Sequence, residues 1–435
     1  MRKKKLFISL IGALFLFLLL LLFNNHFINR TEGHYYVSND GSDSNTGRSP
    51  RQSWKTLKKV NKYKFKPGDV IYFKRGDVWR GQLIPNAGAE NNYIEYTAYG
   101  TGEKPVILGS FSKNNSNDWK EVSDNIWSAN ATEIDVGNII FNNGEAVGIK
   151  VWSSTELDKL NEFYYDSNSQ KVELFCIGNP ALTYSSIECA INKDIISQAN
   201  KSYIVYDSLS LKYGAAHGIG GRNTSNIIVR NCDISYIGGG DHNNQKIRFG
   251  NGIEFWANAQ NNTVENCKIW EIYDAGLTNQ NNIPNCTQQN ITYKNNEIWN
   301  CEYSFEYWNR PVGSVTKNIV FTNNKCSNAG GGWGHSQRPN PSGRQLCLAA
   351  NTSTVENLVI ENNTFYGAEE ALIYLHKNFN QSDNIFIRNN IFFQYKDRDF
   401  ARWKQKVYSF DDYTKFIIDN SMDKYSPLYV FYGTS

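Results

Sequence analysis

Residues 290–300 read NITYKNNEIWN, and five other segments of the chain have the same form. In each, an asparagine begins a run of alternating polar and apolar residues, and a second asparagine stands five residues later. The other segments are NIIVRNCDI (226–234), NNTVENCKI (261–269), NIVFTNNKC (318–326), NLVIENNTF (357–365) and NIFIRNNIF (384–392). A phrase that recurs at a nearly fixed interval is the signature of a repeat architecture.

The repeats predict a solenoid of short strands. Period-two alternation of Ile, Val, Phe and Tyr is typical of strands, and no helix long enough for a crossover separates them. Each repeat is therefore expected to form one coil, with parallel strands about 4.8 Å from those of the next coil. Asparagine suits the bend between strands because it tolerates left-handed backbone and can bond its neighbours in a ladder. The predicted corner residues, 27 to 39 residues apart, are Asn231, Asn266, Asn295, Asn323, Asn362 and Asn389.

The repeats over residues 201–395 resemble the right-handed parallel β-helix proteins of the pectin lyase-like superfamily. The segments YYVSNDGSDSNTGRSPRQSWKTLKKV (35–60) and PGDVIYFKRGDVWRGQLIP (67–85) are similar to the opening of its carbohydrate-active members. The resemblance implies an all-β fold, a right-handed parallel β-helix. It leaves the reaction open, because lyases, hydrolases, epimerases and phage adhesins share that fold.

Changes in the pattern divide the chain into five predicted parts. Residues 119–192 fit the repeat poorly and resemble the small β-domain inserted in some β-helix glycoside hydrolases; FYYDSNSQKVELFCIGNP (163–180) is interpreted as a hairpin there. RDFARWKQKVYSF (398–410) is interpreted as a helical cap, because a solenoid needs its open end covered. The parts are a basic end, membrane anchor and short linker (1–33), an N-terminal cap and first coils (34–118), an inserted small β-domain (119–200), the parallel β-helix repeats (201–395) and a C-terminal cap (396–435).

The N-terminus has the pattern of a membrane anchor. MRKKK is followed by eighteen uncharged residues, 6–23, at the lower end of the length that spans a bilayer as a helix. No small-residue cleavage site follows, and the basic end is expected to stay in the cytoplasm. We therefore predict a single N-terminal transmembrane helix that contacts the lipid bilayer through residues 6–23, with the main domain extracytoplasmic. The alternative is a cleaved signal, which makes the protein secreted.

Composition excludes several partners. The chain has 435 residues and a net charge of only +3, with basic residues scattered beyond the first five, which argues against nucleic-acid binding. Cys232 and Cys267 directly follow the second asparagine of their repeats, so the eight cysteines are interpreted as free, buried thiols. No CxxC or HxxxH spacing and no tight aspartate cluster is present, so neither a metal ion nor another cofactor is predicted.

Two long insertions crowd one edge of the predicted solenoid. Triple-glycine segments stand seven residues after Asn231 and after Asn323, and they open the loops GGGDHNNQKIRFG (238–250) and GGGWGHSQRPNPSGR (330–344). Both loops therefore leave the solenoid at the same corner. Loops held on a rigid scaffold commonly carry function.

Polar side chains of these loops and of the matching corners are candidates for chemistry. Histidine suits a general base or a partner of sugar hydroxyls, and arginine suits the carboxylate of a uronate. Glu302 and Glu369 also occupy matching corners. For either of them alone, the simpler interpretation is a polar side chain that caps a turn in solvent. The selected residues are Asp241, His242, Asp274, His335, Arg338 and Arg344.

A second alignment places two carboxylates on one outer column. The segments GIEFW (252–256), GLTNQ (276–280) and SFEYW (304–308) follow the corners of successive coils. If residues 253, 277 and 305 lie in the core, alternation directs Glu254, Thr278 and Glu306 outward. Two residues further along each strand, Trp256, Gln280 and Trp308 form the next outward column. Two strand spacings separate the glutamates by about 9–10 Å, at the upper edge of the range for inverting glycosidases.

These residues predict an enzyme that cleaves glycosidic bonds in a polysaccharide, with Glu254 and Glu306 as acid and base, or one of them with Asp241 or Asp274. The tryptophans would stack on sugar faces, and Gln280, Arg338 and Arg344 complete the predicted substrate-binding set. One alternative is a polysaccharide lyase acting by β-elimination on a uronate-containing glycan, with His242 or His335 as base and Arg338 neutralising charge. The other is a non-catalytic glycan-binding or surface-structural β-helix protein.

Overall fold

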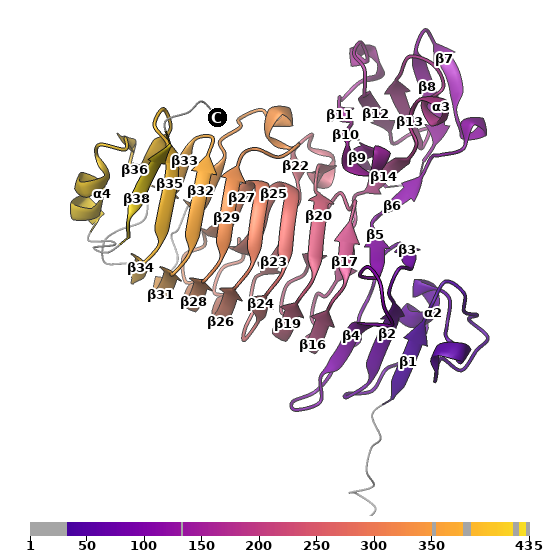
Figure 1. Cartoon of the computed structure of the whole chain (residues 1–435), viewed down its shortest axis with the longest axis horizontal. Coiled ribbons are helices and arrows are strands. Elements are labelled where there is room, and N and C mark those ends of the chain that lie inside the picture. The colour runs from indigo at the N-terminus through magenta and orange to yellow at the C-terminus, as the bar shows by residue number, and fades with distance from the viewer. Residues whose placement is uncertain (1–32, 132–133, 350–353, 377–383, 421–425, 432–435) are drawn as a thin grey trace, which may run out of the picture.

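The computed structural model describes residues 33–431, except for 132–133, 350–353, 377–383 and 421–425. These residues form a parallel β-helix whose coils stack along the long axis of the molecule (Figure 1). The predicted membrane helix at 6–23 lies outside the described residues. Within the described part of the chain, no helix has the length and apolar character that crossing a membrane requires.

The first face of the solenoid is, in the described part of the chain, a sheet of ten parallel strands. The N-terminal segment contributes its first strands, so the coils begin upstream of the asparagine repeats. The strands are β1 (His34–Val37), β2 (Val70–Lys74), β4 (Ile94–Tyr99), β16 (Ser202–Asp207), β19 (Ser225–Arg230), β24 (Thr263–Glu265), β26 (Thr287–Lys294), β28 (Val315–Thr322), β31 (Thr354–Glu361) and β34 (Ile385–Arg388).

The second and third faces belong to one continuous sheet, because the long strands β25 (Lys268–Asn281) and β27 (Glu297–Asn309) bend from one face to the other. The second face also contains β3 (Val78–Arg80), β5 (Val106–Leu108), β17 (Ser210–Lys212), β20 (Asp233–Ile237), β29 (Lys325–Ala329), β32 (Thr364–Ala368), β35 (Ile391–Tyr395) and β38 (Leu428–Phe431). The third face contains β15 (Ile196–Ser197), β18 (Ile219–Gly220), β23 (Ile253–Trp256), β30 (Arg344–Ala349), β33 (Ala371–Leu375) and β36 (Asp399–Trp403).

Asparagines define the corner between the first and second faces. The six predicted corner residues, from Asn231 to Asn389, all have positive φ, between 55° and 60°, which asparagine tolerates better than most residues. The buried side-chain ladder, however, is formed by the residue after each corner, not by the corner residue itself. Asn296, Asn324 and Asn363 each donate to the next asparagine of that column at 2.9–3.0 Å. The corner asparagines thus supply the bend, and their neighbours supply the ladder.

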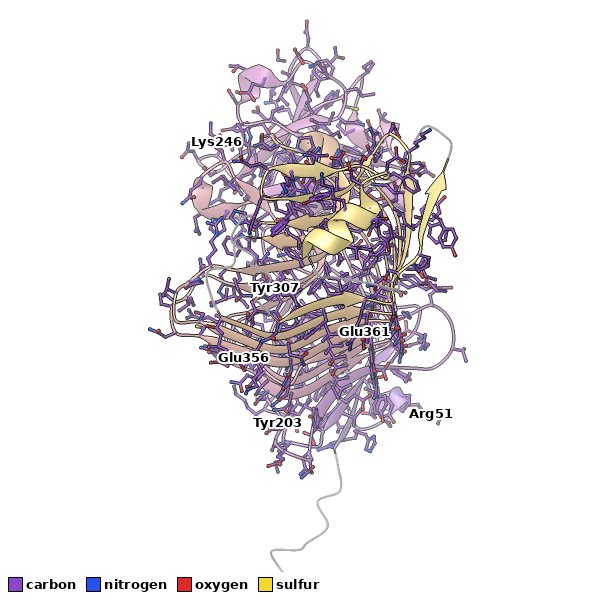
Figure 2. The ribbon with its side chains drawn as sticks, turned by 90° about the vertical axis from the view of Figure 1, so that its left-hand side faces the viewer. Arg51, Tyr203, Lys246, Tyr307, Glu356 and Glu361 are labelled. Carbon is purple, nitrogen blue, oxygen red and sulfur yellow. The ribbon has the colours of Figure 1, made fainter. Side chains whose placement is uncertain are left out.

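Cysteines occupy the same column in the earlier coils. Cys232 and Cys267 stand where later coils have the ladder asparagines, and the Cys267 N–H donates to Asn296 Oδ1 at 2.9 Å. All eight cysteines are free and buried, as predicted. In Figure 2, which looks along the stack, Tyr307 lies inside the coil, whereas Lys246 lies near its upper edge. The interior is therefore a packed core and not a channel.

An inserted β-domain stands beside the first coils (Figure 1). Its described residues form one sheet of β6 (Ser110–Ser112), β9 (Val136–Phe141), β10 (Ala146–Val147) and β14 (Ile187–Ile191), and another of β7 (Lys120–Ser123), β8 (Ile126–Asn130), β11 (Ile149–Lys150), β12 (Glu162–Asp166) and β13 (Lys171–Phe175). Strands β12 and β13 form the predicted hairpin. The sequence-based limits of 119 and 200 remain an expectation; the strands of these sheets begin at Ser110 and end at Ile191.

The C-terminal segment differs from the prediction. Residues 398–410 do not form a helix, because β36 pairs in parallel with β33 and turns back into β37 (Lys406–Tyr408). The turn at Lys404 and Gln405 has positive φ at both residues. Helix α4 (Tyr413–Asn420) follows, and its Phe416 packs against Phe400 and Tyr408. The other α-helices of the described chain are α2 (Leu57–Lys62) and α3 (Pro180–Thr183).

Candidate functional site

Glu254 and Glu306 lie on the outer side of the third face, in the register that the repeats predict. Glu254 pairs with Thr278 of the next coil, and Thr278 pairs with Glu306 of the coil after that. The residue before each of the three is fully buried in the core. Two parallel-strand spacings separate the glutamate Cα atoms by about 9–10 Å. The alternation rule therefore assigned both side chains to the correct side of the strand.

Both carboxylates are nevertheless largely hidden from solvent. Glu254 is 6% exposed and Glu306 is 9% exposed, because the loops beside the third face rise around them. They line a cleft of about 770 Å³, here called the carboxylate cleft. Its other polar and aromatic lining residues are Asp194, His217, Arg222, His242, Arg248, Phe249, Asn251, Trp256, Asp274, Gln280, Asn282, Tyr303, Trp308 and Arg338. Glu254 and Glu306 thus line a shielded cleft and do not lie on an open surface.

Glu254 is held by an asparagine and a histidine. Asn251 Nδ2 donates to Glu254 Oε2 at 3.0 Å, and His217 Nε2 lies 3.5 Å from the same oxygen. The Asn251 backbone N–H donates to His217 Nδ1 at 3.1 Å, so the proton of the neutral ring lies on Nε2 and faces Glu254. The pKa of Glu254 is raised, by burial first and also by the negative charges of Asp194 and Asp274; His217 and Asn251 oppose this rise because they favour the carboxylate.

Glu306 has a different environment. Its carboxyl group accepts a hydrogen bond from Gln280 Nε2, the residue of the intervening coil. Burial, followed by the negative charge of Asp274, raises the pKa of Glu306 to about 8. The Gln280 bond and the charge of Arg338 oppose this rise without cancelling it. Glu306 is therefore a carboxyl group that keeps its proton at neutral pH.

Arg338 connects this cleft to the corner below it. Its Nη2 lies 3.1 Å from Asp274 Oδ1, its Nη1 donates to Tyr273 O at 2.8 Å, and its Nε lies 3.7 Å from Glu302 Oε1. Glu302 also accepts bonds from the Ser342 N–H at 2.7 Å and from His335. Glu302 therefore anchors the loop 330–343 from beneath, which is the structural role that its position suggested.

Trp256 and Trp308 flank Gln280 at one end of the carboxylate cleft. Their ring centroids are 6.4 Å apart at an interplanar angle of 32°, and the Arg310 guanidinium lies 4.5 Å from the Trp308 ring. Elsewhere on the solenoid Trp270 and Trp299 stack at 4.9 Å and 3°, so their faces cover each other. The tilted pair leaves more ring surface for a ligand, and tryptophan faces suit the apolar faces of sugars.

Two selected residues of the loop 330–344, His335 and Arg344, lie outside the carboxylate cleft. His335 Nδ1 is 2.9 Å from Glu302 Oε2, and the ring lines a separate cleft of about 260 Å³. Arg344 begins β30, pairs with Glu370, and lies 3.7 Å above the Tyr374 ring. Neither side chain lines the carboxylate cleft.

The two selected residues of the loop 238–250, Asp241 and His242, have different surroundings. His242 lines the edge of the carboxylate cleft, with its ring 5.3 Å from that of Phe249. Asp241 lies on β21 (Gly240–Asp241), which pairs with β22 (Arg248–Phe249), and its carboxylate accepts a bond from the Ile247 N–H at 3.3 Å. Asp241 therefore organises the loop and is absent from the lining of the cleft.

Sequence reasoning missed a polar column beside the glutamates. His217, Asn251 and Tyr303 all stand two residues before the paired core positions of their strands, so they occupy equivalent places in different coils. Extending the alignment one coil upstream, to YGAAHGIG (213–220), would have found His217. No sequence pattern predicted that Arg248 would line the cleft, because its position depends on the path of a long loop. Among the residues that the structure describes, no group of three His, Cys, Asp or Glu side chains is arranged to hold a metal ion.

The fold defines the chain as a parallel β-helix protein. No protein-family model and no curated protein matches its sequence. Among solved structures, a glycoside hydrolase superposes with a TM-score of 0.50 and 10% identity over 92% of this chain and 96% of its own.

Two further solved structures are similar in shape. A GH136 lacto-N-biosidase from Eubacterium ramulus superposes with a TM-score of 0.49 and 14% identity, covering 94% of this chain and 69% of its own. A rhamnogalacturonan lyase gives a TM-score of 0.44 and 10% identity, covering 84% and 74%. The parallel β-helix that the repeats predicted is established by the sheet topology of the chain itself, and the glycoside hydrolase has a similar fold. Identities this low establish the fold alone.

Proposed function

We propose that this protein is a membrane-anchored, extracytoplasmic enzyme that cleaves glycosidic bonds in a polysaccharide by general acid–base catalysis. The observation that supports it most directly is the placement of Glu254 and Glu306. They lie two strands apart in one shielded cleft, with different partners. The fold shared with a solved glycoside hydrolase is consistent with this chemistry.

Glu306 is the proposed general acid. A general acid must carry its proton at the working pH, and a pKa of about 8 keeps Glu306 protonated near neutrality. The proton would pass to the oxygen of the leaving sugar as the glycosidic bond breaks. Gln280 fixes one carboxyl oxygen of Glu306, so the orientation of the group is set before substrate binds.

Glu254 is the proposed base. His217 and Asn251 present two N–H groups to it, which favours the ionised carboxylate. A carboxylate can take a proton from water while that water attacks the anomeric carbon. Two strand spacings separate the Cα atoms of the two glutamates by about 9–10 Å. Two carboxyl groups on such positions can stand far enough apart to hold a water between them, so we propose inversion of the anomeric configuration. Asp274, which is paired with Arg338, is the alternative base.

Lyase chemistry is the second candidate. Arg338 lines the cleft and could neutralise a uronate carboxylate, and His242 stands at the edge as a possible base. However, Arg338 is already paired with Asp274, and His335 is bonded to Glu302 outside this cleft. The contacts therefore favour hydrolysis. A non-catalytic glycan-binding protein is the third candidate.

Product analysis separates the three. The purified full chain is incubated with a panel of polysaccharides, and released reducing sugar and ultraviolet absorbance are followed together. Hydrolysis gives reducing sugar without absorbance, elimination gives unsaturated ends that absorb, and a binding protein gives neither. NMR of the first-formed anomer then tests inversion. Absorbing products would replace the hydrolase assignment with the lyase, and binding without products would remove the catalytic one.

A further inference from the structure

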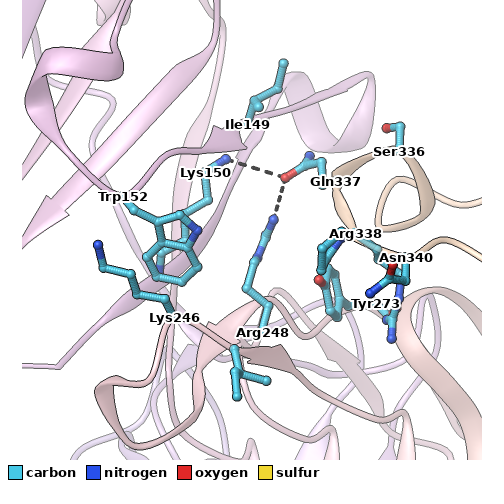
Figure 3. A pocket seen from close by; sticks show the side chains of 12 residues that line it. Ile149, Lys150, Trp152, Lys246, Arg248, Tyr273, Ser336, Gln337, Arg338 and Asn340 are labelled. Carbon is cyan, nitrogen blue, oxygen red and sulfur yellow. Dashed lines mark hydrogen bonds between the residues drawn. The ribbon is translucent and has the colours of Figure 1, made fainter.

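A second cleft, of about 740 Å³, lies between the inserted β-domain and the two long loops (Figure 3). Strand β11 and Trp152 line it from the inserted domain, residues 246–248 from the first loop, and residues 336–340 from the second. We call it the insert cleft. Figure 3 shows the Arg248 side chain reaching up between Lys246 with Trp152 on one side and Tyr273 with Arg338 on the other.

The insert cleft and the carboxylate cleft adjoin each other, because Ile247, Arg248 and Arg338 line both of them. A polymer whose cleaved bond lies beside Glu254 and Glu306, and which passes these three side chains, would reach the inserted domain.

Gln337 fixes the two walls of the insert cleft relative to each other. Its Oε1 accepts from Arg248 Nη1 at 2.7 Å and from the Lys150 backbone N–H at 3.5 Å. Its Nε2 donates to Gly148 O of the inserted domain at 2.9 Å. A single amide thus joins both long loops and the inserted domain, so the cleft is preorganised and its binding cost is reduced.

The charge of the insert cleft is positive. Four cationic side chains and no carboxylate line it. Lys150 is neutralised by Asp135 at 2.5 Å and Arg338 by Asp274, which leaves Arg248 and Lys246. Arg248 is held by Gly239 O, Gly137 O and Gln337 Oε1, none of which carries charge. Among the described residues, no carboxylate lies within 4.0 Å of the Arg248 or Lys246 nitrogens.

Apolar surface accompanies this charge. Trp152, Ile149 and Ile247 are among the lining residues, and the two isoleucines are 41% and 56% exposed. A sugar ring presents an apolar face to such side chains, whereas a carboxylate or sulfate on the same ring needs a cation. A neutral sugar would give Lys246 and Arg248 no partner of opposite charge.

We propose that the insert cleft binds an acidic sugar unit, bearing a carboxylate or a sulfate, of the same polysaccharide that is cleaved in the carboxylate cleft. The cleavage named in this inference rests on the proposed function. The binding of the acidic sugar does not depend on it. The inserted domain is then a specificity element that selects acidic polymers. Trp152 packs on the sugar ring, and Lys246 and Arg248 compensate its charge.

Affinity electrophoresis of the full chain in detergent tests this, with Glu306→Gln as background to prevent turnover. Polygalacturonate supplies carboxylates, dextran sulfate supplies sulfates, and dextran is the neutral polymer. We expect retention by one acidic polymer and not by dextran, with retention falling as salt rises. Lys246→Glu should weaken binding to that polymer about tenfold, and Trp152→Ala should weaken it at all salt concentrations. Lys325→Glu, an exposed site on the second face, is the matched control.

The result identifies which proposal fails. Equal retention by dextran and the acidic polymers, or no effect of both Lys246→Glu and Trp152→Ala, overturns the acidic subsite even when the wild type cleaves a polysaccharide. Selective, Lys246-dependent retention supports the subsite even when the wild type cleaves nothing, in which case only the enzymatic proposal falls. Comparing polygalacturonate with dextran sulfate decides between carboxylate and sulfate.

Discussion

Asn251 donates a hydrogen bond of 3.0 Å to Glu254, three residues further along the chain. Its Oδ1 accepts from the Ala275 N–H of the next coil at 3.0 Å, and its backbone N–H binds His217 of the previous coil at 3.1 Å. One asparagine therefore links three coils around the proposed base. The site is held by the stacking of the solenoid itself, so its geometry and the stability of the fold are connected.

Replacing either proposed catalytic group removes activity without unfolding the protein. We expect Glu306→Gln and Glu254→Gln each to lower kcat by about 10²–10⁴, because each removes one proton-transfer group. Thermal stability should change little, since the amide has the same shape and carries no buried charge. Glu356→Gln, on the first face and paired with Lys317, is the control and should keep full activity. Full activity in both site variants would move the search to Asp274 and His242.

Activity should be lost at alkaline pH. Glu306 acts as an acid only while protonated, and its pKa is raised to about 8, so kcat/KM should fall as the pH rises through about 8. Asp274→Asn removes a negative charge that raises this pKa, so the alkaline limb should move to lower pH. The measurement is a pH profile of both proteins. A wild-type profile that stays flat to about pH 10 contradicts the assignment of Glu306 as the general acid. Complete loss of activity in Asp274→Asn would instead assign the base to Asp274.

Asn251 should act as a positioning residue. Removing its amide with Asn251→Ala takes a donor from the Glu254 carboxylate, which raises the pKa of Glu254 and moves the acidic limb of the profile to higher pH. We expect kcat to fall about tenfold while KM stays nearly constant, because the base and not the sugar is displaced. A change in KM alone, or an unmoved acidic limb, would assign Asn251 a purely structural role.

The buried asparagine ladder should contribute strongly to stability. Asn324 Oδ1 accepts from the Asn296 side chain, and its Nδ2 donates to Tyr293 O and Asn363 Oδ1, all within 2.9–3.0 Å. Asn324→Ala leaves these groups unpaired in the core and should cost about 2–4 kcal/mol of unfolding free energy. Calorimetry of the melting transition measures it.

A matched exposed ladder provides the control for this stability measurement. Gln289→Ala removes the half-exposed bond from Gln289 Nε2 to Gln260 Oε1 and should cost less than about 1 kcal/mol, because water replaces the lost partner. Equal melting temperatures for Asn324→Ala and Gln289→Ala would show that the buried ladder is not a major source of stability.

The proposed anchoring predicts a protected N-terminus. Protease added to intact cells should digest residues 24–435 and leave the basic end inside, because residues 1–5 are expected on the cytoplasmic side. Epitope tags at the two ends, detected on blots before and after lysis, measure this. Recovery of a soluble mature protein beginning after Phe23 would instead identify a cleaved signal.

The sequence by itself determined the coil and its register. Asparagines at a fixed offset and alternating residues are local patterns, and stacking makes equivalent positions coincide, so the amino-acid order alone aligns Glu254, Thr278 and Glu306. The same logic located the tryptophans and the buried cysteines. It failed at 398–410, where pairing of β36 with the previous coil outweighs the helix that the segment alone suggested.

Only the tertiary structure decided what surrounds the carboxylates. Arg248 and Arg338 come from loops that interrupt the repeat, so no periodic pattern fixed their contacts. His217 and Asn251 do occupy equivalent places in the repeat, but their hydrogen bonds to each other and to Glu254 follow only from the folded coils. His335, three residues before Arg338, turns instead to Glu302. The physical reason is that a stacked strand is constrained by its neighbours on both sides. A long loop takes the path that pairs its own polar groups, which depends on the whole molecule.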